Sequence, residues 1–113
     1  MQYRTFPKIN EKVSLLGMGC MRLPLNEDES VDEAKAIAII RGAIDSGVNY
    51  VDTAYMYHDG ASETVVGKAL QGGYREKVLL ADKMPIWLAK DEEQMKQIFA
   101  TQLERLQVDC IDM

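Results

Sequence analysis

The sequence predicts an α/β fold of parallel strands joined by helices, and two features carry that prediction. Short apolar runs alternate three times with amphipathic segments of helical length, and the connections are long enough for parallel pairing. Residues suited to chemistry end two successive strands, Asp52 after the first and Lys83 after the second. Periodicity alone leaves a doubly wound sheet open. Because (β/α)8 barrels carry their active sites at the carboxyl ends of their strands, the site favours part of a barrel.

The first twenty residues predict a hairpin followed by a strand. Residues 2–6 alternate polar and apolar side chains, a turn follows over 7–11, and the chain returns through 13–14. We expect this β-hairpin to close one end of the barrel. The apolar stretch 15–20 then predicts the first parallel strand, in which glycines permit close approach to the backbone.

The first helix has a clear start and a clear end in sequence. Ser30 and Glu33 form a capping box, so we expect the helix to begin at Ser30 and to run to about Ser46. Gly47 follows at the position where a left-handed residue commonly ends a helix. The apolar face is expected to comprise Ala34, Ile37, Ala38, Ile40 and Ile44.

Two further strand–helix units follow. A strand over 49–52, a loop over 53–61 and a helix from Ser62 form the second unit. A strand over 78–81 and a helix capped by Asp91 form the third. The positions expected to be buried on these two helices are Val65, Val66, Ala69 and Leu70, then Met95, Ile98, Phe99, Leu103 and Leu106.

Residues 108–113 predict the opening of a fourth strand. The expected domain is therefore one partial barrel over residues 1–113: a truncated (β/α)8 barrel with an N-terminal hairpin, about three βα units and the start of a fourth strand. A complete barrel takes about 250 residues. Because an unclosed sheet leaves open edges and an uncovered apolar face, we expect either a fragment of a longer protein or self-association. The fragment is favoured, since the sequence stops inside a predicted strand.

Composition excludes several classes of function. The net charge is −5 and no two Lys or Arg residues are adjacent, which argues against a nucleic-acid surface. No apolar run reaches the ~18 residues of a membrane span, and no leader-like segment opens the chain. We therefore expect a cytoplasmic protein that does not associate with a membrane. The two cysteines, Cys20 and Cys110, lie far apart and only one histidine is present, so no metal site is expected.

Asp52, Tyr57 and Lys83 form a candidate proton-transfer site. A phenol is ordinarily too weak an acid to donate a proton at neutral pH. An ammonium about 3.5 Å away, at an effective dielectric constant of about 20, attracts a phenolate by roughly 4 to 5 kcal/mol. A carboxylate beside that ammonium keeps it charged. Taken singly, the three residues also fit a loop cap, a packing tyrosine and a surface lysine.

His58 is the only histidine and directly follows Tyr57. Because adjacent side chains usually point apart, we expect a solvated loop residue with no part in catalysis.

Two motifs resemble the aldo-keto reductases. The first is Gly-Val-Asn-Tyr-Val-Asp-Thr-Ala-x-x-Tyr over 47–57, followed by Ser-Glu-x-x-x-Gly-Lys-Ala-Leu over 62–70. The second is Leu-Gly-Met-Gly-Cys-Met-Arg-Leu-Pro over 16–24, which resembles the family's first strand and its loop. The second motif is also similar to the branch whose longer members carry a C-terminal ferredoxin-like iron–sulfur segment.

The resemblance implies an oxidoreductase that reversibly reduces an aldehyde or ketone, a small carbonyl substrate, with NADPH, or less often NADH. Tyr57 would be the general acid, Lys83 its activating neighbour, and Asp52 the partner that holds Lys83. The implied contacts on the nicotinamide side of the cofactor are Cys20, Met21 and Arg22, together with Asp52.

One departure from the family pattern limits what this chain is expected to do. The family's catalytic histidine lies a few residues beyond the pattern Leu-x-x-Asp-x-Ile-Asp, here 106–112, and the strands that bind the cofactor's phosphate and adenosine come later. We therefore expect the isolated chain to be inactive. Two alternatives stay open: a non-catalytic partial barrel acting as an assembly or binding module, and a related barrel with another role, such as an ion-channel β-subunit.

Overall fold

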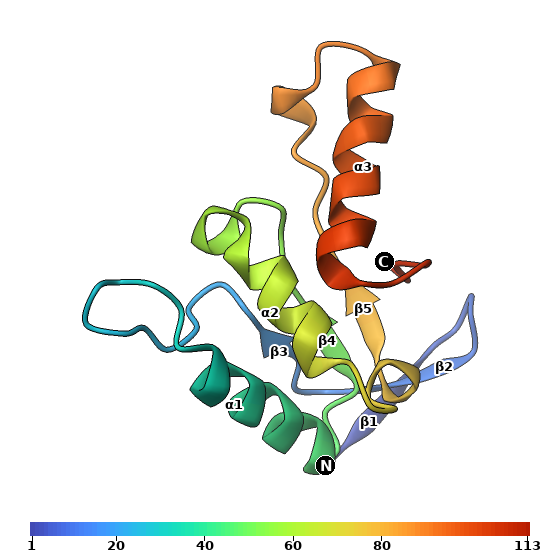
Figure 1. The fold of residues 1–113 in the computed structure, drawn as a ribbon. Helices are drawn as coiled ribbons and strands as arrows, with labels where there is room; N and C mark the ends of the chain where they lie inside the picture. Colours follow the sequence, from blue (N-terminus) through green and yellow to red (C-terminus); the bar gives the residue numbers. More distant parts are fainter.

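The computed structural model describes residues 1–113 and consists of a hairpin, a short parallel sheet and three helices (Figure 1). The antiparallel hairpin pairs β1 (Tyr3–Phe6) with β2 (Glu11–Ser14), and the parallel sheet has the order β3 (Met18–Gly19), β4 (Tyr50–Asp52), β5 (Leu79–Ala81). The helices are α1 (Glu33–Asp45), α2 (Ala61–Ala69) and α3 (Glu92–Leu106), with 3-10 turns η1 (Tyr57–Gly60), η2 (Arg75–Lys77) and η3 (Ile86–Leu88). None of these helices combines the length and the apolar character needed to cross a membrane.

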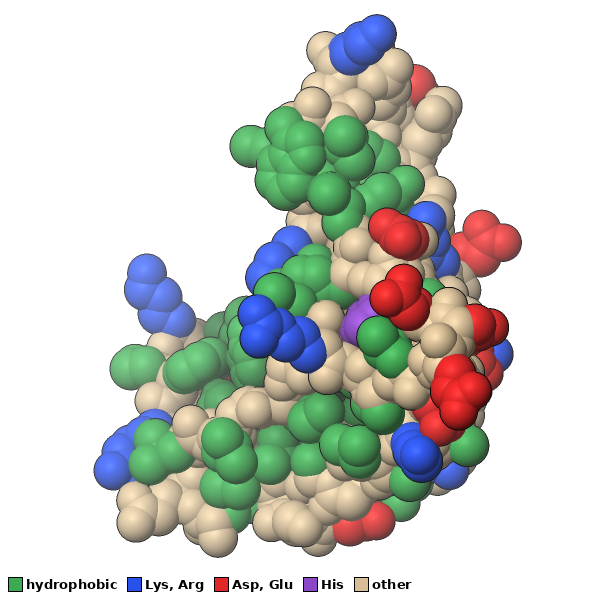
Figure 2. Space-filling model, turned by 90° about the vertical axis from the view of Figure 1, so that its left-hand side faces the viewer, with side chains coloured by type: hydrophobic (Ala, Val, Ile, Leu, Met, Phe, Trp, Pro, Cys, Tyr) green, Lys and Arg blue, Asp and Glu red, His purple; other side chains and the backbone are tan.

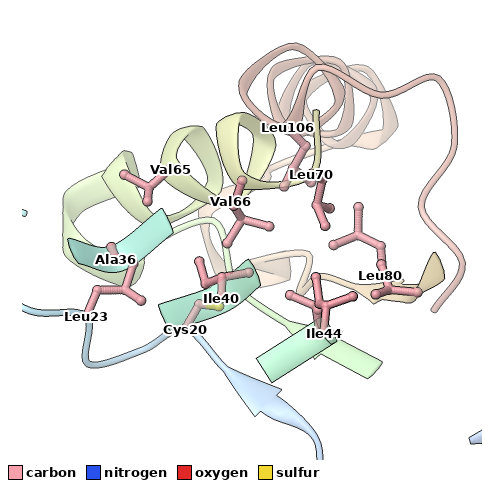
Figure 3. Close-up of a cluster of buried hydrophobic side chains, with 13 residues drawn as sticks. Cys20, Leu23, Ala36, Ile40, Ile44, Val65, Val66, Leu70, Leu80 and Leu106 are labelled. Carbon is pink, nitrogen blue, oxygen red and sulfur yellow. The ribbon is translucent and has the colours of Figure 1, made fainter. Parts of the chain in front are cut away.

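The core lies between the sheet and the two helices α1 and α2. In the parallel register Val51 pairs with Leu80, and both side chains are completely buried against the helices, while Tyr50 and Asp52 on either side of Val51 are only half-buried. Figure 3 shows the buried cluster, in which Ile40 of α1 meets Val66 of α2. Each fully buried aliphatic side chain of this kind contributes about 1.5–3 kcal/mol, so this cluster holds the strand ends in place.

The hairpin is fastened to the amino-terminal ends of the parallel strands, away from the candidate site. Asn49, directly before β4, donates through Nδ2 to Lys12 O at 2.7 Å and accepts from Ser14 N at 2.7 Å. The predicted hairpin is confirmed. The first parallel strand is shorter than expected, because only Met18 and Gly19 of the stretch 15–20 pair with β4.

The predicted capping box of α1 is wrong. Asp32 is the N-cap, and its Oδ1 accepts a hydrogen bond from Lys35 N at 3.1 Å. Ser30 instead lies in the preceding turn, where both its amide and its hydroxyl donate to Asp28 Oδ1. The Ser30 hydroxyl, which was expected to cap the helix, is therefore hydrogen-bonded to the Asp28 carboxylate instead.

The C-terminal end of α1 is as predicted. Its buried face is as predicted at Ile40 and Ile44, and Ile37 is half-buried against the core. Gly47 has φ +103°, and its N–H and that of Val48 donate to Ile44 O and Ala43 O, which is a Schellman ending. The buried stripe is Ala36, Ile40 and Ile44, at a spacing of four residues, whereas Ala34 and Ala38 are exposed. On α2, all four residues expected to be buried are buried.

Helix α3 stands away from the rest of the molecule and packs only through its last turns (Figure 1). Asp91 caps it as predicted, with Oδ1 accepting from Gln94 N at 2.9 Å. Of the apolar residues expected to face inward only Leu106 is buried, and Met95 and Phe99 are exposed. The helical period therefore identified an apolar stripe correctly, but no element of this chain covers its first half.

The segment expected to open a fourth strand lies beside β5 and is not a regular strand. Met113 alone bonds as in a parallel pair, because its N–H donates to Leu80 O and its carbonyl accepts from Asp82 N at 3.2 Å. The N–H groups of Asp112 and Met113 both donate to Leu80 O. The side chain of Asp112 also accepts from Leu80 N at 2.7 Å, where a regular strand would use a backbone carbonyl.

Candidate active site

Parallel pairing brings the carboxylate of Asp52 and the ammonium of Lys83 together where the strands end. Asp52 pairs with Ala81 in the register of β4 and β5, so Lys83 follows just beyond the end of the neighbouring strand. Lys83 Nζ donates to Asp52 Oδ1 at 2.6 Å and to Thr53 O at 3.0 Å. The ammonium is thus held by one carboxylate and one backbone carbonyl, and half of the lysine side chain is exposed to solvent.

The third candidate, Tyr57, lies against the same ammonium. Lys83 Nζ is 4.8 Å from the centroid of the Tyr57 ring, and Tyr57 is half-buried. Burial alone would lower the pKa of Lys83, but its interactions with Asp52 and with Tyr57 outweigh burial and raise that pKa above its usual value. Lys83 is therefore a cation at neutral pH, in contact with both a carboxylate and a phenol.

An open pocket of about 420 Å³ adjoins these residues, and six of the nine residues that line it are hydrophobic. Tyr57, Lys83 and His58 line one part of it, and Met21, Pro85 and Trp87 are among the others. An apolar pocket with a few polar groups at one side is the usual form of a small-molecule site.

The residues expected on the nicotinamide side of the cofactor differ in their exposure to solvent. Met21 is exposed and lines the pocket, and Arg22 is exposed beside it in the chain. Cys20 is completely buried, and burial first, then the negative charge of Asp52, raise the pKa of its thiol to about 12 against the opposing effect of Lys83. The Cys20 side chain is thus an uncharged core group that does not reach the pocket.

His58 is not a solvated loop residue, and that expectation is wrong. It is half-buried and lines the pocket, and its Nε2 accepts a hydrogen bond from Leu23 N at 3.0 Å. The backbone explains the difference, because His58 and Asp59 both have φ +52° and Gly60 has φ +93°. In this left-handed turn two adjacent side chains, Tyr57 and His58, line the same pocket instead of pointing apart.

A second charged cluster, which sequence reasoning missed, lies buried behind the site. Glu63 of α2 is completely buried, and Arg105 Nη1 of α3 donates to its Oε1 at 2.9 Å. The same nitrogen donates to Tyr55 O at 3.1 Å, and the guanidinium lies 4.4 Å from the centroid of the Tyr55 ring. The signal in sequence was available, since Glu63 falls three and seven residues before Val66 and Leu70, on the buried face of the helix.

Asp82 completes this cluster. Its Oδ1 accepts from Lys83 N at 2.8 Å, while its Oδ2 and Glu63 Oε2 are buried with no other hydrogen-bond partner. Burial first, and then a hydrogen bond with Glu63, raise the pKa of Asp82 to about 8. The raised pKa favours the protonated form of Asp82, in which one proton can serve both the Asp82 and the Glu63 carboxyl groups.

The fold and the site define a class before any comparison with other proteins. Parallel strands alternate with helices, and Asp52, Tyr57 and Lys83 lie together where these strands end, which is where (β/α)8 barrels carry their active sites. The model of the Aldo/keto reductase family matches residues 15–113, and the chain belongs to that family.

Relatives and solved structures agree with this assignment. The chain is 34% identical over 110 residues to "Probable aldo-keto reductase 1" of Glycine max. The matched region covers 90% of this chain and 32% of that protein. It is similar to an aldo/keto reductase of Klebsiella pneumoniae solved with NADP and acetate (TM-score 0.80, 33% identity, 93% of this chain and 35% of that one). It is also similar to an aldo-keto reductase of the same organism solved with NADPH (TM-score 0.83, 32% identity, 100% and 38%).

The chain spans about a third of the length of these relatives. The predictions that the fold is part of a (β/α)8 barrel and that the family is that of the aldo-keto reductases are confirmed. The proposed relation to the iron–sulfur branch stays a prediction.

Proposed function

We propose that this chain carries the proton-donating side of an oxidoreductase that reduces aldehydes or ketones with NADPH. Tyr57 is the general acid in this proposal, Lys83 its neighbouring cation and Asp52 the residue that holds Lys83. The observation that supports it best is the single ammonium in contact with both Asp52 Oδ1, at 2.6 Å, and the Tyr57 ring. NADH is the alternative cofactor.

The charges explain how such a site would move a proton. When a phenol gives its proton to a carbonyl oxygen, the phenolate that remains is stabilised by an adjacent cation. Lys83 supplies that cation, and Asp52 together with Thr53 O keeps it in place. The negative charge of Asp52 also partly offsets the positive charge of Lys83. Asp52 therefore weakens the stabilisation of a Tyr57 phenolate by Lys83 while it holds the ammonium in position.

The residues around the pocket fit the nicotinamide end of the cofactor. A planar ring and a small carbonyl compound suit a pocket with a mostly hydrophobic lining. Met21, Arg22 and Asp52 would hold the nicotinamide end, while Cys20, being buried, would contribute only through the loop that it begins. When bound, the cofactor supplies the hydride that reaches the carbonyl carbon.

Binding is tested first, with the 113-residue chain itself. Trp87 is the only tryptophan and lines the pocket, so its fluorescence should fall as NADPH binds. Saturable quenching that excess NADP competes away supports a cofactor site on this chain. A linear, non-saturable response would place cofactor binding outside it.

Catalysis is tested in a chimera, because the relatives are about three times as long. Residues 1–113 would replace the matching part of the Klebsiella pneumoniae reductase that was solved with NADPH. In this chimera Tyr57→Phe should lower the rate of reduction of an aromatic aldehyde about a hundredfold or more, since general acids contribute at least that much. The control is Tyr50→Phe, which makes the same change in β4 at a residue that does not line the pocket, and it should leave the rate within about threefold of the parent's. Equal rates for the two variants would overturn the role of Tyr57.

We also propose that the isolated chain is inactive and self-associates. Self-association is supported by apolar side chains of η3 and α3, because Ile86, Trp87 and Phe99 are all exposed. Figure 2 shows hydrophobic side chains gathered on the part of the molecule that projects from the rest. Exposed patches of this kind favour association in water. Light scattering tests it, and a monodisperse monomer at high concentration would show that this surface does not drive assembly.

A further inference from the structure

We propose that His58 is a positioning residue that fastens the loop Cys20–Leu23 to the segment carrying Tyr57, and so sets how Met21 faces the pocket. The inference deepens the proposed function, because that loop is the proposed contact for the nicotinamide end. The fastening itself is a property of the folded chain and can be measured without the cofactor.

The contact joins the pocket to the core. Leu23 is buried, with 5% of its surface exposed, and belongs to the main apolar cluster. Its N–H donates to His58 Nε2 at 3.0 Å. Because a nitrogen that accepts a hydrogen bond carries no proton, the neutral ring holds its proton on Nδ1. Replacing this acceptor would leave a buried amide without a partner.

The loop is held at its other end by the same segment. Ser62 Oγ donates to Cys20 O at 2.8 Å and lies 2.8 Å from Thr53 Oγ1, and all of these groups are buried. One contact is made by His58 within η1 and the other by Ser62 in the first turn of α2. The two loop residues between the contacts, Met21 and Arg22, are exposed. The loop can therefore tilt toward or away from Tyr57 only if one fastening breaks.

The backbone at His58 is arranged for this contact. Non-glycine residues seldom adopt a positive φ, and His58 and Asp59 do so in succession. Gly60 completes the turn, and a Cβ there would lie 2.9 Å from the Arg105 guanidinium. The turn directs the imidazole toward Leu23 while Tyr57 faces Lys83.

Three variants separate the hydrogen bond from the other properties of His58. His58→Gln keeps an acceptor at about the reach of Nε2. His58→Phe keeps a ring of similar size but has no acceptor. His58→Asn tolerates a positive φ better than most residues, but its side chain is too short to reach Leu23.

Amide hydrogen exchange of Leu23 is the primary measurement, made on the full 113-residue chain. We expect exchange at Leu23 to rise about tenfold in the Phe and Asn variants and to stay within about threefold of the parent's in the Gln variant. Exchange in the α1 core should stay unchanged in all three. Titration with NADPH should then show weaker binding for Phe and Asn, with Gln close to the parent.

Unchanged Leu23 exchange in His58→Phe would overturn the fastening, as would equal effects of Gln and Phe. Parent-like behaviour of His58→Asn would assign the effect to the backbone turn and also overturn it. If the parent itself binds no NADPH, the proposed cofactor site on this chain fails, while the exchange measurement still decides the fastening.

Discussion

Two ion pairs in this molecule have similar geometry and opposite surroundings. Lys83 and Asp52 are 2.6 Å apart with 49% and 35% of their side chains exposed, whereas Arg105 and Glu63 are 2.9 Å apart with 27% and 0% exposed. Water reaches both partners of the first pair, whereas in the second pair Glu63 is completely buried and only Arg105 is partly exposed. An exposed pair adds little to stability, typically 0–1 kcal/mol, whereas removing one partner of a buried pair leaves a charge that cannot be solvated.

The difference in solvent exposure indicates which of the two ion pairs can take part in proton transfer. Lys83 can change its interactions with a phenol at little cost to the fold, because solvent compensates for the change. Arg105 cannot, because it connects Glu63 of α2 with the backbone and the ring of Tyr55 from its place on α3. We therefore expect the first pair to determine activity and the second to determine stability.

Removing the buried cation should have the largest effect on stability. Arg105→Ala leaves the Glu63 carboxylate buried without its partner, and we expect a loss of about 3–5 kcal/mol in the free energy of unfolding. Urea denaturation followed by circular dichroism measures it. The double variant Glu63→Gln with Arg105→Met, which removes both charges, should recover part of the loss. A loss below about 1 kcal/mol for Arg105→Ala would mean that the pair is structurally dispensable.

Substitutions at the close contact between α2 and the end of α3, beside the ion pair of Arg105 and Glu63, should have the next largest effect on stability. A Cβ at Gly67 would lie 2.7 Å from Arg105 O and from the Leu106 carbonyl, so Gly67→Ala should cost about 1–3 kcal/mol. Gly42→Ala is the matched control. It also lies inside a helix but has nothing within 4 Å, and it should stabilise α1 by about 0.5–1 kcal/mol. Thermal unfolding of the two variants should therefore shift in opposite directions.

The proton on Asp82 should make the buried cluster sensitive to pH. The folded chain holds this proton up to a pKa of about 8, against an ordinary value of 3.8. Between these values the folded state binds more protons than the unfolded state, so stability contributed by this group falls as pH rises from about 4 to about 8 and is level above that. Asp82→Asn, which keeps a donor to Glu63, should lose this slope. Parallel curves for the two proteins in urea titrations from pH 5 to pH 9 would contradict the shared proton.

The smallest effect on stability is expected at the exposed pair, where the effect on function should be largest. Lys83→Met should change the free energy of unfolding by less than about 1 kcal/mol. In the chimera described above it should lower aldehyde reduction at least about a hundredfold while NADPH still binds. The comparison between the two pairs would fail if Lys83→Met unfolded the chain as Arg105→Ala is expected to do.

Local patterns predicted most of what lies within a few residues along the chain. The Asp91 cap, the Gly47 ending of α1 and the buried face of α2 each depend on neighbours within one or two helical turns. The sequence also predicted that Asp52 and Lys83 lie near each other, because Asp52 ends β4, Lys83 lies two residues beyond β5, and neighbouring parallel strands end on the same side of a sheet.

The predictions that were wrong share one feature, since each depended on which partner or neighbouring segment a residue contacts in the folded chain. Ser30 fulfilled the local rule for a cap, and a carboxylate two residues away took its hydroxyl. The stripe on α3 has the correct period, but whether it is covered depends on which other segments reach it. His58 has a partner 35 residues away in sequence, and no periodicity encodes that distance.

The sequence by itself thus determined the α/β class of fold through local periodicity and strand order, and its motifs resemble the family to which the chain belongs. The same motifs contain the three residues proposed for proton transfer. Only the tertiary structure decided that Glu63, Asp82 and Arg105 meet in a buried cluster and that His58 is held against Leu23. The reason is that burial and charge pairing depend on segments distant in sequence, and the free energy of an ion pair depends on how much water surrounds it.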